Sequence, residues 1–595
     1  MATNQHTVRL FWILLIGSMW SALLSAQDTL AVNWASSGQK AAVPNDLLPD
    51  YTALPAKRFG RKSIKDLHAA GYLEASIDSL YTKNDTLYPI LHLGKRYTWA
   101  HLDLSKIPPL LAEGVRLPRF RDKSFSYQEI SNLFERLLTR AENSGYPFAA
   151  VRLDSIDLDD GIVRARVHVN LNDYVTIAQI KMAGDLKISM PYLRYYLGIE
   201  PGQPFDRSKV MAVEDRLAER PFIKSAARPT ISFLGTGATL NLDLDRKPAN
   251  QFDILLGLLP SPVEGRRFQL TGNVNVVMEN QFGAGERFHF NFESLRPQTQ
   301  ELELDFSYPF IFDLPFGADA EFDLYKRDTT YLDVNYELGI EYYINQRTTI
   351  KFFARNYSSR LLGINTRTIR NTKLLPINLD LSRNTFGFEI TNSKLNYRFN
   401  PRKGRLWKFR AGAGTKKIKK NESILAISDP LNPEFNFESL YDDLDLNSFQ
   451  YSLSSELAFY IPLLQQSTIK LSNRSGFLDS GTDVLNNELF RIGGTKLLRG
   501  FNEEAIFANL YSVFTAEYRL LFSQNSNLFF FTDIGYTQQQ AQATTIHDQL
   551  VGIGTGINLE TKVGVFAISY AIGRQRNVPF SFREGKIHFG MVSLF

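Results

Sequence analysis

None of the residue types that usually perform chemistry in enzymes has a catalytic spacing in this sequence. The eight histidines are scattered, and no two of them have the spacing of metal ligands. The sequence contains neither a Gly-x-Ser-x-Gly nucleophile motif nor a P-loop. Gly552, Gly554 and Gly556 form a Gly-x-Gly-x-Gly run, but it lies inside a predicted strand, where close strand packing is the simpler explanation. We therefore predict no enzyme activity, no catalytic residue, no metal and no cofactor.

Charged residues beside glycines offer non-covalent chemistry instead. One predicted loop carries the run Leu498, Arg499, Gly500 and Phe501. A later strand carries Phe531, Asp533 and Gly535 at alternate positions. A guanidinium and a carboxylate can bind each other through two parallel hydrogen bonds. What these residues do depends on the elements that carry them.

The start of the chain predicts export from the cytoplasm. Arg9 precedes an apolar run over residues 10–16, and the small residues Ser25-Ala26 follow. This pattern is typical of a secretory signal peptide over residues 1–26, with cleavage near Ala26. The alternative is a transmembrane anchor, but the run is shorter than the ~20 apolar residues that a spanning helix needs.

The end of the chain and the composition favour a β-barrel in an outer membrane. The segment from Lys586 to Phe595 alternates large apolar and other residues and ends on an aromatic ring, which suits a membrane–water interface. The chain has 44 Phe and 26 Tyr, yet no apolar stretch after the signal is long enough for a spanning helix. It has no Cys, which excludes a disulfide framework, and a net charge of only +5, which gives no reason to expect nucleic-acid binding.

Small mixed modules are predicted in the front third. Residues 27–60 are rich in Ala, Ser, Asn and Pro and indicate a linker. Residues 106–174 and 175–248 then each predict a module of about 70 residues with the order β-α-α-β-β, and residues 61–105 predict a less complete copy. The repeat resembles the polypeptide-transport-associated (POTRA) domain. That resemblance implies periplasmic modules that bind client chains by adding a strand to a sheet edge.

Residues 249–595 predict a sixteen-stranded antiparallel transmembrane β-barrel. Apolar and polar residues alternate with period two, as in Arg287–Glu293 and Phe514–Phe522. In a barrel the apolar face meets lipid and the polar face lines the lumen. The expected strand starts lie near Gln251, Arg266, Gly285, Gln300, Gly317, Thr330, Arg347, Arg383, Arg405, Ser448, Ser467, Phe507, Leu528, Gln549, Lys562 and Lys586.

Connection lengths provide a separate check on this count. The long gaps 359–382, 417–447 and 478–506 follow the seventh, ninth and eleventh predicted strands. Tight turns follow even-numbered strands, as at Asn345-Gln346. Outer-membrane barrels have short periplasmic turns and longer outer loops, so the parity supports both the count and the orientation.

At this point the chain closely resembles the BamA/TamA-type outer-membrane assembly-factor superfamily. The resemblance rests on the Arg-Gly-Phe motif of the loop after strand eleven and the Phe-x-Asp-x-Gly motif of strand thirteen. The turn 280–285 is similar to the family's turn between strands two and three. The resemblance implies that the loop folds back into the lumen, and that its contact with the wall pins the loop and supports folding of the barrel.

Physical reasoning then predicts a pair between Arg499 and Asp533. An unpaired guanidinium in a partly water-excluded lumen would be costly. Asp533 can accept a charge-assisted bond from it, and Glu517 on strand twelve can share it. Gly500 and Gly535 leave room for close approach, and Phe501 packs beside the pair. The alternative is an ordinary surface loop with a solvated arginine.

The first and last strands form a second predicted site. In the family these strands meet at a weakly bonded seam that opens sideways to admit a client strand. Both strands are short here, and since each hydrogen bond contributes only ~1 kcal/mol net, such a seam opens easily. The alternative is a static, fully zipped barrel. The seam residues that we expect to matter are Phe252, Ile254, Gly257, Phe589, Gly590 and Phe595.

These observations predict a factor that inserts or translocates proteins at the bacterial outer membrane, with its amino-terminal modules in the periplasm. The expected partners are unfolded outer-membrane or secreted client proteins, outer-membrane lipids and periplasmic or lipoprotein subunits. One alternative is a two-partner-type exporter dedicated to one secreted protein. Another is a passive porin or receptor, a class that lacks both the POTRA-like modules and the Arg499/Asp533 pair.

Overall fold

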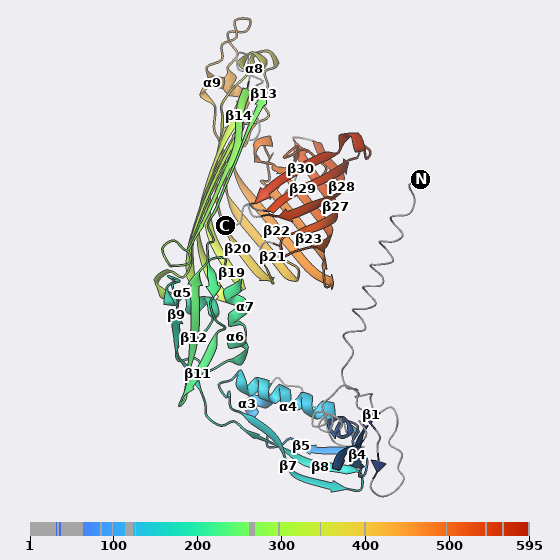
Figure 1. The fold of residues 1–595 in the computed structure, drawn as a ribbon. Helices are drawn as coiled ribbons and strands as arrows, with labels where there is room; N and C mark the ends of the chain where they lie inside the picture. The colour runs from blue at the N-terminus through green and yellow to red at the C-terminus, as the bar shows by residue number, and fades with distance from the viewer. Residues whose placement is uncertain are drawn as a thin grey trace, which may run out of the picture. The chain divides into compact units, whose positions relative to one another are not determined.

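The protein folds as two units in a computed structural model (Figure 1). The first unit comprises residues up to 178 together with 202–208 and 233–238, and the second comprises the rest of the chain. The predicted signal peptide, most of the predicted linker 27–60 and Phe595 lie outside the residues that the structure describes. The described residues are 31–32, 35–36, 64–83, 86–97, 99–113, 123–124, 127–260, 268–294, 298–345, 347–397, 400–482, 484–494, 497–541, 544–561, 565–576 and 578–592.

The first module is a four-stranded sheet with a helix over 64–69. Strands β1 (Ala31–Val32) and β2 (Ala35–Ser36) pair in parallel with β4 (Thr86–His92), and β3 (Ser76–Lys83) pairs antiparallel with it. Both β1 and β2 lie inside the predicted linker, so that prediction was wrong for these residues. A two-stranded hairpin alone is only marginally stable in water. Strands β1 and β2 extend the β3–β4 hairpin into a sheet.

The second module contains β5 (Trp99–Asp103), α3 (Pro109–Ala112), β6 (Lys123–Ser124), α4 (Tyr127–Glu142), β7 (Ala150–Asp159) and β8 (Ile162–Asn170), with the sheet order β6-β5-β8-β7. The apolar face of α4 is buried against this sheet. Because β5 pairs in parallel with β8, this strand belongs to the second module. The predicted boundary at residue 105 therefore lies one strand too late.

The third module follows the predicted β-α-α-β-β order. It contains β9 (Thr176–Ala183), α5 (Met190–Leu197), α6 (Arg207–Met211), α7 (Val213–Ala218), β10 (Ile223–Ser225), β11 (Thr230–Leu234) and β12 (Gly237–Arg246). The second helix is divided into α6 and α7, and the strand after it is divided into β10 and β11. Helix α5 begins after Ser189, whose hydroxyl accepts a hydrogen bond from the backbone N–H of Tyr192, and it ends at Gly198 in the left-handed conformation. Alternate residues of β12 are buried, as expected for a sheet covered on one face.

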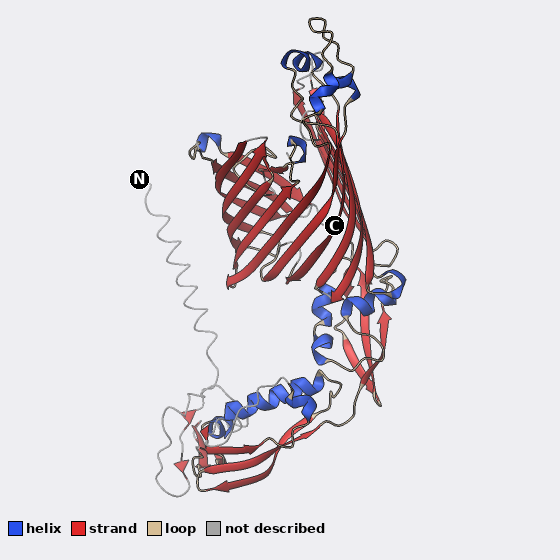
Figure 2. Cartoon of the chain, turned by 180° about the vertical axis from the view of Figure 1, so that it is seen from behind, coloured by secondary structure: helices blue, strands red, loops and turns tan. Residues whose placement is uncertain are grey.

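A single antiparallel sheet of sixteen strands forms the rear of the chain and confirms the predicted count (Figure 2). No helix of the described residues is long and apolar enough to cross a bilayer. The strands are β13 (Gln251–Pro260), β14 (Phe268–Glu279), β15 (Arg287–Ser294), β16 (Gln300–Tyr308), β17 (Phe316–Arg327), β18 (Tyr331–Asn345), β19 (Thr348–Leu361), β20 (Leu381–Leu395), β21 (Gly404–Ile418), β22 (Asn447–Leu464), β23 (Ser467–Asp479), β26 (Leu510–Leu521), β27 (Asn527–Ala541), β28 (Thr544–Glu560), β29 (Val565–Arg574) and β30 (Lys586–Val592).

The largest difference from the predicted starts is at β28, which begins at Thr544 rather than near Gln549. These extra residues are mostly polar and pair with the polar end of β27, beyond the apolar alternation that marks a membrane strand. At the two ends of the strand order stand β13 and β30, and no pairing between them is present among the described residues.

The two faces of the sheet differ as a membrane barrel requires. On β18 the side chains of Asn335 and Glu337 are buried, whereas Tyr336, Leu338 and Ile340 are more than half exposed. The polar set therefore faces inward and the apolar set faces lipid.

The long connections carry the small helices α8 (Thr366–Thr372), α9 (Glu422–Leu425) and η3 (Phe437–Tyr441). They follow β19 and β21, the seventh and ninth barrel strands, which confirms the predicted parity.

Candidate functional site

The loop between β23 and β26 folds back onto the inner wall of the sheet. It contains η4 (Asn486–Glu488) and a short hairpin of β24 (Phe490–Ile492) and β25 (Ile506–Ala508). A buried apolar cluster fixes this hairpin to β26 and β28, and its members are Ile492, Leu498, Ala508, Val513 and Leu550. Because Leu498 belongs to the cluster, the next residue, Arg499, is held against the wall.

Arg499, Asp533 and Glu517 form one ion-paired group, which we call the clasp. The Nε and Nη2 atoms of Arg499 each donate to one carboxylate oxygen of Asp533 at 2.8 Å. Its Nη1 donates to Glu517 at 2.7 Å, and its backbone N–H also donates to Asp533 at 3.0 Å. The structure thus brings together the three charged residues that the sequence singled out, in the bidentate geometry that is strongest for this pair.

Neighbouring side chains complete the clasp. The guanidinium lies over the ring of Phe531, 3.4 Å from its centroid, which adds a cation–π contact. The hydroxyl of Thr515 donates to Asp533 at 2.8 Å, and Arg519 donates to Glu517 at 2.8 Å. Only 1 % of the Asp533 side chain is exposed. Each buried charge therefore has partners on several sides, as burial requires.

Glycines give the loop its close approach to the wall. Gly500 has φ +92°, and a Cβ there would lie 2.7 Å from the carbonyl of Ile572 on β29. A Cβ on Gly552 would overlap the carbonyl oxygen of Arg499, and one on Gly573 would lie 2.5 Å from that of Gly500. Sequence reasoning missed the role of Gly552 and Gly573, because nothing in a strand pattern shows which glycine a distant loop will cover.

Two predicted neighbours take different places from those expected. A Cβ on Gly535 would lie 3.4 Å from the side chain of Leu498, an ordinary contact, so this glycine is not needed for close approach. Phe501 packs with the apolar cluster of the hairpin, near Gly573. Gly554 and Gly556 of the Gly-x-Gly-x-Gly run lie beneath the rings of Phe531 and Phe529, which agrees with the close packing predicted for them.

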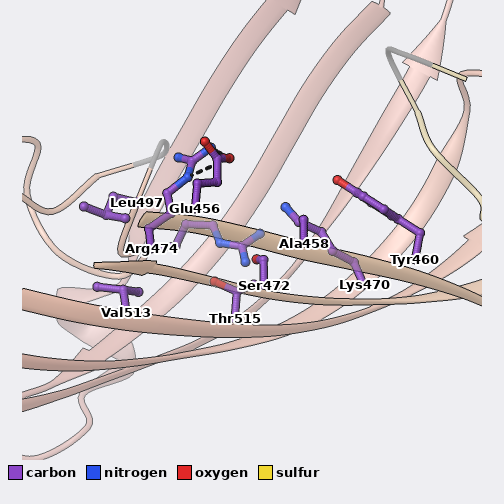
Figure 3. A pocket seen from close by; sticks show the side chains of 10 residues that line it. Glu456, Ala458, Tyr460, Lys470, Ser472, Arg474, Leu497, Val513 and Thr515 are labelled. Atoms are coloured by element: carbon purple, nitrogen blue, oxygen red, sulfur yellow. Dashed lines mark hydrogen bonds and ion pairs between the residues drawn. The ribbon is translucent and has the colours of Figure 1, made fainter. Parts of the chain in front are cut away.

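A small polar cavity of about 130 Å³ borders the clasp (Figure 3). Arg474 and Glu456 form an ion pair at 2.8 Å on one side of it. Lys470, Ser472 and Tyr460 also line the cavity, together with Leu497 and Arg499 of the loop. The guanidinium of Arg499, 13 % exposed, therefore borders a polar space rather than an apolar core.

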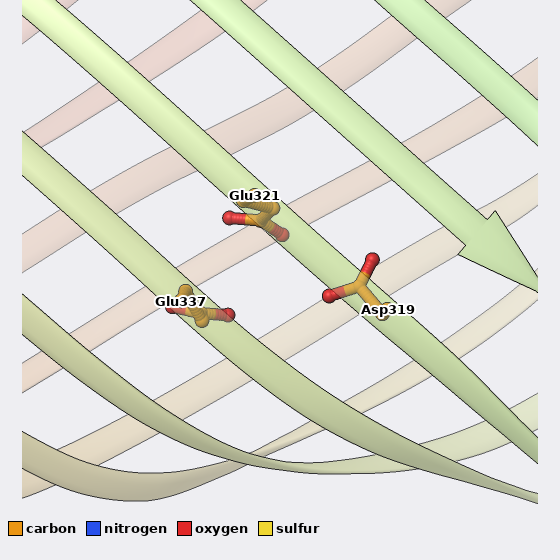
Figure 4. Close-up of side chains that lie close together, drawn as sticks. All are labelled: Asp319, Glu321 and Glu337. Atoms are coloured by element: carbon orange, nitrogen blue, oxygen red, sulfur yellow. The ribbon is translucent and has the colours of Figure 1, made fainter.

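A second polar group on the inner wall lies around Lys351. The carboxylates of Asp319, Glu321 and Glu337 converge from β17 and β18 (Figure 4). The ammonium of Lys351 binds all three, at 2.7 Å from Glu321 and 2.8 Å from Glu337. A Lys side chain thus occupies the place that a cation would take between these carboxylates, and it ties β19 to its neighbours.

The predicted seam residues lie on the two edge strands. Phe252 and Ile254 are 57 % and 54 % exposed, and Gly257 pairs with Thr271 of β14. On the other edge, Phe589 and Gly590 pair with Ile568 and Ala567 of β29, and Phe595 lies outside the described residues. Within those residues each edge strand is bonded on one side alone.

The turn 280–285 holds helix α5 against the sheet. Asn280 donates from its side chain to the carbonyl of Lys187 at 3.0 Å and accepts from the backbone N–H of Gly285 at 2.8 Å. Gly285 has φ +76°, and a Cβ there would overlap the ring of Tyr192 on α5. The sequence singled out this turn only by resemblance, and the structure assigns it a physical role.

These features define an outer-membrane β-barrel protein with amino-terminal POTRA-like modules in the periplasm and a loop folded into its lumen. The model of the Omp85 superfamily domain matches residues 233–592, and the chain belongs to this superfamily. The predicted fold class, location and family resemblance are thereby confirmed at the level of the superfamily.

Two solved structures share the fold at low sequence identity. CdiB from Acinetobacter baumannii is 13% identical with a TM-score of 0.51, over 84% of this chain and 89% of that one. CdiB from Escherichia coli is 12% identical with a TM-score of 0.50, over 91% and 96%. BamA from Haemophilus ducreyi, lacking POTRA domains 1–3, is 14% identical with a TM-score of 0.42, over 84% and 100%. No curated protein sequence matches the chain.

Proposed function

We propose that this Omp85-superfamily protein is an assembly factor that inserts client proteins into the outer membrane through the seam between β13 and β30. The observation that carries the proposal is the pair of edge strands, which are unpaired with each other among the described residues. An edge strand presents a row of free N–H and C=O groups, which is a template for another strand. A client hairpin can add there through main-chain bonds, with little demand on its sequence.

The POTRA-like modules supply the first binding step in this proposal. Each of the three module sheets ends in an edge strand, such as β7 in the second module. Unfolded outer-membrane or secreted proteins are the expected clients, and periplasmic or lipoprotein subunits are further expected partners. The exposed aromatic and aliphatic belt of the barrel contacts outer-membrane lipid.

A dedicated exporter of the two-partner type is the main rival. Such exporters carry two periplasmic modules. The three module sheets of this chain favour the assembly role. A passive porin or receptor is disfavoured by the modules and by the clasp, neither of which a diffusion pore needs.

Site-specific crosslinking tests the proposal. A photoreactive side chain replaces Phe252 on the seam, and a matched control replaces Leu338, which is 69% exposed on the lipid face of β18. We expect the Phe252 probe, and not the Leu338 probe, to capture newly made outer-membrane barrel proteins. Depletion of the protein should also lower many folded barrels together. Loss of a single secreted protein, with no captured barrel, would instead identify an exporter.

A further inference from the structure

The folded-in loop has a second attachment, which lies on a different part of the wall from the clasp. Its short helix η4 contacts strands β19 to β22, whereas the clasp lies on β26 and β27. We call the contacts of Asn487 and Glu488 the latch.

Glu488 is the charged centre of the latch. Its side chain is fully buried, and the ammonium of Lys416, with 1% exposed side chain, lies 2.5 Å from it. Gln450 donates to the same carboxylate at 2.9 Å, and the backbone N–H of Leu485 donates at 3.0 Å. Two opposite charges buried this completely must remain paired, because an isolated one would be strongly penalised.

Asn487 adds uncharged bonds to the neighbouring strand. Its side-chain N–H groups donate to the hydroxyl of Ser359 at 2.7 Å and to the carbonyl of Leu379 at 3.0 Å. The backbone carbonyl of Asn487 accepts from the hydroxyl of Tyr357 at 3.0 Å. Together with Glu488, this residue fixes η4 to β19, β21 and β22 and to the segment just before β20.

The segment between the two attachments also contacts the wall on the same side as the latch. The Arg491 guanidinium lies 3.8 Å from the ring centroid of Tyr325 and 3.9 Å from Asp333. The Tyr325 hydroxyl donates to Glu504 on the far side of the loop hairpin at 3.0 Å. The loop therefore runs across the lumen from β17–β22 to β26–β29, held at both sides.

We propose that the latch closes the pore, as a task separate from that of the clasp. The clasp joins the loop to the wall near the carboxy-terminal strands and stabilises the barrel. The latch holds the first half of the loop, described over residues 484–492, across the lumen. If the latch opens while the clasp holds, this half swings away from β19–β22 and leaves a path for ions. The inference concerns ion passage and is independent of which client the protein handles.

A disulfide tests the latch in the full-length protein. The natural chain has no Cys, so Asn487→Cys with Ser359→Cys introduces the only pair. Conductance of the purified protein in planar lipid bilayers is measured after oxidation and again after reduction. We expect the oxidised channel to stay closed and the reduced channel to conduct several-fold more. Mass spectrometry establishes the extent of disulfide formation in each sample.

Glu488→Gln provides a second test that does not need a disulfide. It keeps the shape of the side chain and removes the charge that Lys416 requires. We expect several-fold higher conductance than the wild type. The heat-modifiable folded fraction should be unchanged, because opening of the latch returns Lys416 to water in the lumen instead of leaving it buried and unpaired. Glu438→Gln is the matched control, because Glu438 forms a solvent-exposed ion pair with Lys420 in an outer loop, and its conductance should equal that of the wild type.

Two results would overturn the proposal. One is wild-type conductance in folded Glu488→Gln together with no difference between oxidised and reduced disulfide channels. The other is loss of the folded fraction in Glu488→Gln to the extent seen in Arg499→Ala, which would make the latch part of the folding machinery.

Discussion

Asp533 accepts three hydrogen bonds from Arg499, two from the guanidinium and one from the backbone N–H. The two residues are 34 positions apart in the chain and belong to a loop and a strand. The contact therefore reports that the loop is folded into the lumen, and it couples the shape of the loop backbone to the wall. When the Arg499 side chain is removed, Asp533 keeps the bond to the backbone N–H of the loop. When the Asp533 side chain is removed, all three bonds are lost.

Removing either side chain of the pair should destabilise the barrel. Arg499→Ala leaves the buried carboxylate of Asp533 without its main cation, and Asp533→Ala leaves the guanidinium with Glu517 alone. Breaking a buried pair in this way costs ~3–5 kcal/mol. The measurement is the heat-modifiable folded fraction on gels.

The double variant provides the control for this pair. Since one interaction is lost in all three proteins, the double variant should be no worse than the poorer single variant. Arg499→Lys should fail to restore folding, because an ammonium cannot form the bidentate pair. Normal folding in both single variants would remove the case for the clasp.

Gly552 should tolerate a methyl group far less well than Gly535. A Cβ on Gly552 overlaps the carbonyl oxygen of Arg499, so Gly552→Ala must push the loop away from the wall. A Cβ on Gly535 meets Leu498 at 3.4 Å, so Gly535→Ala needs almost no adjustment. We expect a reduced folded fraction for the first variant and a value near the wild type for the second. Equal effects would mean that the loop is not seated on Gly552.

The sheet could be predicted because its physical signal is local. A membrane strand must show one face to lipid, so residues such as Tyr336 and Leu338 alternate with Asn335 and Glu337 and mark the strand. The loop and strand motifs were placed correctly because counting strands placed Arg499 in a loop and Asp533 on the wall.

The remaining features depend on which distant residues meet. Glu488 and Lys416 lie in an outer loop and at an outer strand end, where charged residues are usually solvated, yet here they are buried together. Gly552 likewise depends on a distant residue. It must be a glycine because a loop about fifty positions earlier in the chain packs against it. Strands β1 and β2 were missed because strands of two residues are too short to show a period.

Acid should weaken the second module through Asp103. The hydroxyl and backbone N–H of Ser105 and the guanidinium of Arg166 lower the pKa of Asp103 to about 2, from its usual value of about 3.9. A lowered pKa in the folded state contributes stability that is fully present above about pH 4 and is lost as the pH falls toward 2.

Pepsin cleavage of the full-length protein between about pH 4 and pH 2 measures this effect. Asp103→Asn should be cut faster than the wild type near pH 4, and the difference should shrink toward pH 2, where a growing share of the Asp103 carboxylate is protonated in the folded protein. Asp160→Asn is the control, because Asp160 is 96% exposed with one distant partner. A difference that persists unchanged at the acid end would show that packing, rather than charge, is responsible.

Gly285→Ala should loosen helix α5 from the turn that holds it. The methyl group would overlap the ring of Tyr192, and the residue would also have to adopt φ +76°, which costs ~1 kcal/mol or more for an L-residue. Limited proteolysis within residues 187–222 of the purified protein measures the loosening. Gly202→Ala separates the two effects, because Gly202 has φ +87° but nothing within 4 Å of its Cβ position. If overlap dominates, Gly285→Ala should increase cleavage far more than Gly202→Ala. Adding Tyr192→Ala to Gly285→Ala should not increase cleavage further, because the second change removes the ring that the new methyl group overlaps. Equal cleavage of the two glycine variants would reduce the role of Gly285 to backbone conformation alone.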